Sequence, residues 1–151
     1  MHDFLLHLHS ILRWVVVLSG GFTVVRYSAG FFGKRNFQKL DNTIAAVFIG
    51  SLHAQLLIGL ALYFIVQPWT MFGGDMKLIM KDSVARFKTV EHLVGMLLAI
   101  IIAQVGRTLS KRATTDAAKF RIGLLLMGAA FAILMATIPW PFRTALGGHW
   151  F

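Results

Sequence analysis

Ionisable side chains interrupt several of the apolar stretches of the sequence. Burying such groups in a membrane costs free energy, and they usually belong to a functional site. They are His9, Arg13, His53, Glu91 and His92, with Gln55 as a further polar neighbour. Imidazole nitrogen is a common ligand of haem iron and of zinc, copper or iron ions. These residue types therefore predict a haem or metal site, and the alternative is a network of hydrogen bonds between helices.

The depth of each histidine in a membrane follows from the helical rise of 1.5 Å per residue. If the first apolar run is centred near Val16, His9 lies about 10 Å from the midplane. If the third is centred near Leu98, His92 lies about 9 Å from it on the same side, whereas His53 lies close to the midplane. Facing helices supply haem ligands at similar depth, so His9 and His92 are the predicted pair and His53 competes for either place.

Arg13 follows His9 by one helical turn and shares its face. Its guanidinium could hold a haem propionate or a quinone carbonyl, or it could form a structural ion pair with Glu91. A divalent metal bound by the three histidines and a carboxylate is a further alternative. The sequence contains no HExxH motif and no glycine-rich phosphate loop. His149, in the C-terminal tail, is expected at the surface.

Composition limits the class of protein. The chain is 57% hydrophobic and only 14% charged, against about 25% charged residues in an average soluble protein. Its mean hydropathy of +0.70 indicates that the lipid bilayer is its solvent. The net charge of +9 lies mostly between apolar runs, which favours lipid headgroups over nucleic acid as its partner. The absence of cysteine excludes disulfides, iron–sulfur clusters and c-type haem attachment.

Four apolar runs are long enough to cross a bilayer, which takes about 20 residues. The sequence therefore predicts an all-α integral membrane four-helix bundle that forms a single transmembrane domain over residues 1–151. The predicted spans cover residues 4–27, 43–66, 89–106 and 122–140. Residues 76–88 alternate apolar and charged side chains, which predicts either a short helix in the membrane interface or an extension of the third span.

Basic residues predict the orientation, because cytoplasmic loops are enriched in lysine and arginine. The first loop carries four of them against Asp41 alone, and the third loop carries five against Asp116 alone. These two loops are expected to be cytoplasmic, so both termini lie on the outer, periplasmic side. Together with the family resemblance given in the next paragraph, this orientation implies a multi-pass protein of the bacterial inner (cytoplasmic) membrane.

Several phrases resemble those of small bacterial four-span membrane proteins labelled cytochrome b or cytochrome b-like. The resemblance runs from His9 to the final GGHWF and rests on HSILRWVVVL (9–18), HAQLLIGLALYF (53–64), RFKTVEH (86–92) and IPWPFR (138–143). It implies b-type haem held by His9, His53 or His92, electron transfer, and contact with quinone. The matching arginines are Arg13, Arg86 and Arg143. The chain lacks the four evenly placed histidines of a two-haem core, which favours one haem in the outer half.

The leading hypothesis is therefore a membrane-bound b-type cytochrome-like electron-transfer protein. It would hold one haem b by two of His9, His53 and His92, near Arg13. Without a soluble domain it would exchange electrons with quinone or with a respiratory or other membrane partner, as part of an oxidoreductase rather than as a stand-alone enzyme. The alternative is a cofactor-free accessory subunit of a larger membrane complex with a buried His/Arg/Glu network.

Overall fold

The computed structural model of the chain describes residues 2–140, 142 and 143, which form helices and no strand. Four helical segments are long and apolar enough to cross a membrane, which confirms the prediction of an all-α, multi-pass membrane protein. They are α1 (His2–Phe32), α2 (Lys39–Val66), a segment that ends with α5 (His92–Arg112), and α6 (Asp116–Thr137).

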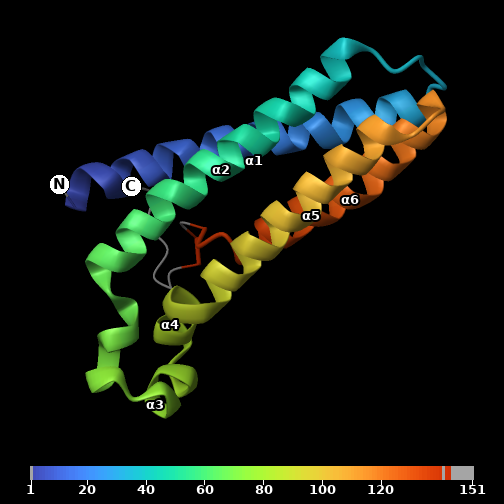
Figure 1. Cartoon of the computed structure of the whole chain (residues 1–151). Helices are drawn as coiled ribbons and strands as arrows, with labels where there is room; N and C mark the ends of the chain where they lie inside the picture. Colours follow the sequence, from blue (N-terminus) through green and yellow to red (C-terminus); the bar gives the residue numbers. More distant parts are fainter. Residues whose placement is uncertain (1, 141, 144–151) are drawn as a thin grey trace.

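The four long helices form an antiparallel ring. Helix α1 packs against α2 and α6, and α5 packs against the same two helices, so α1 and α5 lie on one diagonal of the bundle. Figure 1 shows that the pair α1 and α2 and the pair α5 and α6 lie close together at the end with the short loops. The two pairs diverge toward the end where α1 begins. The start of α1 and the end of α6 lie at this second, open end.

The connection between α2 and α5 contains both structures predicted for residues 76–88, a short separate helix and an extension of the third span. It consists of η1 (Pro68–Gly74), α3 (Met76–Lys81), α4 (Ser83–Arg86) and η2 (Phe87–Glu91). Asp75 begins α3 by accepting hydrogen bonds from the amides of Lys77 and Leu78. Helix α3 is the separate short helix, whereas α4 and η2 extend α5 backward so that the third span starts near Ser83.

The ends of the other spans differ from the prediction for local reasons. Helix α6 stops at Thr137 rather than at residue 140, because Pro139 drives the residue before it out of the helical conformation. Ile138 accordingly has φ −71° and ψ 131°. Helix α1 continues to Phe32, beyond the predicted residue 27, and in this added part Gly30 lies against the ring of Phe120.

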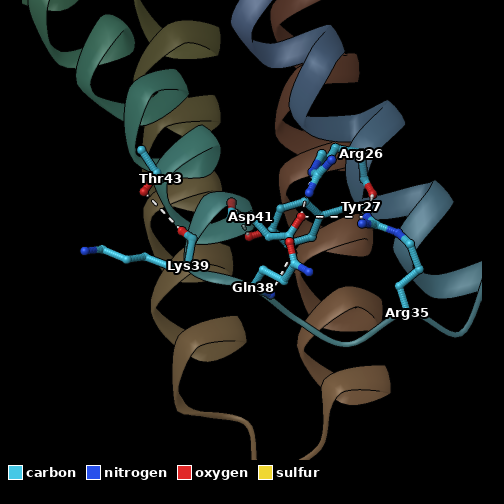
Figure 2. Close-up of polar contacts among 7 residues, drawn as sticks. All are labelled: Arg26, Tyr27, Arg35, Gln38, Lys39, Asp41 and Thr43. Atoms are coloured by element: carbon cyan, nitrogen blue, oxygen red, sulfur yellow. Dashed lines mark hydrogen bonds and ion pairs between the residues drawn. The ribbon is translucent and has the colours of Figure 1, made fainter.

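A buried carboxylate closes the loop end of the bundle. Asp41 has no exposed surface; its carboxylate accepts from Arg26 Nε at 2.7 Å and from the Gln38 amide at 2.8 Å. Arg35 lies 3.8 Å from the same oxygen as Arg26. Figure 2 shows Arg26 of α1, and Arg35 and Gln38 of the loop, gathered around Asp41 at the start of α2. A buried charge is costly unless it keeps its partners, so this network holds the turn between α1 and α2 in place.

Candidate functional site

His9 and His92 face one another across the diagonal of the bundle. The centroids of their imidazole rings lie 6.3 Å apart, and the ring planes are inclined by 74°. They come from α1 and α5 and lie 83 positions apart in the sequence. The structure therefore brings together the two histidines that share one depth in the sequence analysis.

A backbone carbonyl of α6 orients His92. Its Nδ1 donates a hydrogen bond to the carbonyl oxygen of Thr137 at 2.8 Å, which leaves the lone pair of the neutral ring on Nε2. Gly95 permits the contact, because a Cβ there would lie 2.4 Å from Cγ2 of Thr137. A histidine ligand usually has its second nitrogen fixed in this way.

A single π-helical turn, η2, immediately precedes His92. The amide of His92 donates to the carbonyl of Phe87, five residues earlier. Tyr63 of α2 donates from its hydroxyl to the carbonyl of Thr89 at 3.0 Å and so ties the turn to the neighbouring helix. Turns of this kind recur at functional sites because they shift the side chains that follow.

Helix α2 positions His9. The ring lies over Gly59, where a Cβ would be 3.1 Å from Cε1 and 3.6 Å from Nδ1 of the imidazole. Gln55 Nε2, one turn away, donates to the backbone carbonyl of His9 at 3.0 Å. The Nδ1 atom of His9 is buried and has no hydrogen-bond partner among residues 2–140, 142 and 143.

Both imidazoles line a pocket of about 470 Å³ between the four long helices. This volume falls within the range of about 300–1,000 Å³ typical of small-molecule and cofactor sites. Most of the wall is apolar, including Val16, Leu52, Leu56, Met96, Ile100, Leu134 and Ile138. The pocket extends to the open end of the bundle, where His2 and Lys88 line it.

Arg13 lines the same pocket one turn from His9. The residue is only 7% exposed, and its guanidinium carbon lies 5.7 Å from the ring centroid of Trp14. Trp14 in turn packs edge-on against Trp140 with centroids 6.0 Å apart. The sequence prediction that Arg13 shares the face of His9 agrees with this arrangement.

The other predicted site residues lie elsewhere. His53 is exposed on α2, does not line the pocket, and bonds through Nδ1 to the carbonyl of Ile49 in its own helix. Glu91 is exposed and forms an ion pair with Arg86, with Nε and Oε1 2.6 Å apart. Arg143 donates to the carbonyl of Ala136 at 2.8 Å. His149 lies outside the described residues.

These positions bear on the alternative of a divalent metal site. In the part of the chain that the structure describes, no three histidine or carboxylate side chains gather closely enough to hold a metal ion. Among the described histidines, those at positions 9 and 92 bring their imidazole rings together. Haem iron in many cytochromes takes two protein ligands.

The sequence analysis did not identify Gly59, Thr137 or Tyr63 as members of the site. Gly59 carried the only usable signal, since a small residue in a span indicates close approach of another group. The role of Thr137 depends on its backbone carbonyl and that of Tyr63 on a cross-helix contact, and neither leaves a pattern in one sequence. Comparison with known proteins adds no assignment: no family model, curated protein or solved structure matches the chain significantly.

Proposed function

We propose that this protein is a membrane-bound b-type cytochrome that holds one haem between His9 and His92. The observation that carries the proposal is the separation of 6.3 Å between the two ring centroids inside a pocket of cofactor size. Imidazole nitrogen binds a metal ion at about 2 Å, so two rings at this separation could both reach a metal held between them. His53, which is exposed on α2, has no part in this arrangement.

The surroundings of the pair suit an apolar macrocycle. The pocket wall consists largely of aliphatic side chains from α1, α2, α5 and α6, which exclude water from the ring faces. Gly59 provides space beside His9 that any side chain would fill. Thr137 holds His92 with Nε2 available as a ligand. Arg13 supplies a buried cation for an anionic or carbonyl oxygen of the bound group.

When bound, haem b supplies reversible one-electron transfer. The residues of this chain would hold the group, fix the orientation of its ligands and set its potential through burial and hydrogen bonding. The protein would exchange electrons with quinone or with a membrane partner, since its described residues form no soluble domain.

The proposal includes an orientation in the bacterial inner membrane. The loop end of the bundle carries nine basic residues in segments 26–41 and 107–121 against two acidic ones. The positive-inside rule assigns this end to the cytoplasm, which puts the open end, the histidine pair and both termini on the periplasmic side.

An absorbance spectrum of the detergent-purified protein, with extraction of haem and elemental analysis alongside, tests the proposal. A sharp reduced-minus-oxidised b-type signal and about one haem per chain are the expected results. A colourless, metal-free protein from haem-sufficient cells would refute the proposal and favour the cofactor-free accessory subunit. Bound zinc or copper without haem would refute it in favour of a metal site.

A further inference from the structure

The loop end of the bundle carries more positive charge than its own carboxylates neutralise. Asp41 is enclosed by Arg26 and Arg35, and Asp116 pairs with Lys119 at 3.7 Å. In the described part of the chain, six further cations at this end have no carboxylate within ion-pair distance. They are Lys34, Lys39, Arg107, Lys111, Arg112 and Arg121.

The interior of the loop end is tightly packed, and the cations lie around it. The rings of Tyr27, Phe37 and Phe120 contact one another with centroids 5.1–5.9 Å apart. Gly30 and Gly123 allow this contact, because a Cβ at either position would lie 2.2 Å from a ring carbon. A ligand therefore has to bind on the outside of the bundle.

A hollow of about 220 Å³ lies on the outside, between the end of α1 and the start of α6. Its lining combines one cation, one aromatic ring and small side chains: Phe31, Thr115, Ala117, Ala118 and Arg121. The adjacent Phe32 is 76% exposed. A charged and an apolar wall side by side match an amphiphile with an anionic head, whereas a free anion would use the charged wall alone.

We infer that this hollow binds an anionic phospholipid, with the headgroup phosphate at Arg121 and the first part of an acyl chain against Phe31 and Phe32. The hollow lies where two membrane-spanning helices end, which is the level of the lipid headgroups. The surrounding unneutralised lysines and arginines add attraction to a negatively charged leaflet. The inference is independent of the haem site at the opposite end of the bundle.

Native mass spectrometry of the full chain in an uncharged detergent tests the inference. Phosphatidylglycerol and phosphatidylcholine of equal acyl length are titrated against the wild type and three variants. Arg121→Gln should bind phosphatidylglycerol about fivefold more weakly than the wild type, which is the contribution of one cation near an anionic headgroup. Arg121→Lys should retain most of the affinity. Lys81→Gln, which removes an exposed charge from α3 at the other end, should leave the affinity unchanged.

Three outcomes would overturn the inference. Equal affinity for the two lipids would remove the role of the anionic head. An equal loss in Lys81→Gln and Arg121→Gln would show that binding follows net charge rather than the hollow. Complete displacement of the bound lipid by millimolar inorganic phosphate would show that the hollow is a site for small anions.

Discussion

At the scale of single residues, groups on other helices hold each of the two facing imidazoles. His9 lies over Gly59 and receives a hydrogen bond at its carbonyl from Gln55, both on α2. His92 donates to the carbonyl of Thr137 on α6. Because these supports come from different helices, the separation of the rings depends on how the whole bundle packs.

Replacement of Gly59 tests the contact below His9. Gly59→Leu places a side chain where even a Cβ comes within 3.1 Å of the imidazole, so the ring has to move away from His92. We expect haem content in the purified protein to fall at least several-fold. Gly50→Leu is the matched control, since it makes the same exchange in α2 where a Cβ meets nothing within 4 Å. Equal haem content in the two variants would contradict the arrangement.

The charge of Asp41 is a second residue-scale feature. Asp41→Asn leaves the guanidinium of Arg26 without its counter-charge in a part-buried position. We expect a loss of about 1.5–3 kcal/mol in the free energy of unfolding, the usual worth of hydrogen bonds to charged groups. Asp116→Asn, at an exposed pair, should cost less than about 1 kcal/mol. Reversible unfolding in mixed micelles measures both, and a smaller effect at Asp41 than at Asp116 would refute the role of the network.

The meeting of His9 and His92 could be predicted from the sequence, because the helical rise is constant and the apolar runs place both residues at a similar distance from the middle of their spans. The direction in which His53 points could not be predicted. Rotation of α2 about its axis depends on which residues pack inward, and both of its faces are apolar enough to lie in lipid. The structure turns Phe48, Ile49 and Leu52 inward and leaves His53 exposed.

At the scale of helices, small residues set the distance between α1 and α6. Gly30 of α1 lies against the ring of Phe120, and Gly123 of α6 lies against the ring of Tyr27. Each helix thus provides a gap for an aromatic ring of the other. Close approach through small residues is expected where lipid gives no hydrophobic drive for helices to associate.

A larger residue in one of these gaps should separate the two helices. Gly30→Ala puts a Cβ 2.2 Å from the Phe120 ring, so the ring or the helix must shift, at a cost of about 1–3 kcal/mol. Gly128→Ala in α6 meets nothing within 4 Å and should be neutral, or stabilising by up to about 1 kcal/mol. Thermal unfolding in detergent compares them, and a Gly30→Ala midpoint at or above that of the wild type would argue against the close contact.

The number and order of the long helices could be predicted from hydropathy, and the end of α6 is explained by Pro139. The π-helical turn before His92 could not be predicted. The residues Phe87–Glu91 have no composition that distinguishes them from a regular helix, and the hydrogen bond from Tyr63 to Thr89 in this turn joins two helices, which one sequence does not reveal.

At the scale of the whole molecule, the bundle is closed at one end and open at the other. Charge and aromatic packing close the loop end, and the pocket with His9 and His92 extends to the open end. The proposed orientation directs the open end to the periplasm, so that a partner there would approach the site most closely.

Cysteine labelling tests that orientation without interference, because the chain contains no cysteine. Lys111→Cys, at the loop end, should react with a membrane-impermeant thiol reagent only after the cells are opened. Lys81→Cys, on α3 at the open end, should react in intact cells of a strain with a permeable outer membrane. The reverse labelling pattern would show that the protein has the opposite orientation in the membrane.

The most direct test of the central claim is the reduced-minus-oxidised absorbance spectrum of three purified single variants. His9→Ala and His92→Ala should each lose the b-type signal, because each removes one of the two facing imidazoles. His53→Ala, which removes an exposed imidazole from α2, should keep the signal of the wild type. A full low-spin signal in His92→Ala, or its loss in His53→Ala alone, would contradict the assignment of His9 and His92 as the residues that hold the haem.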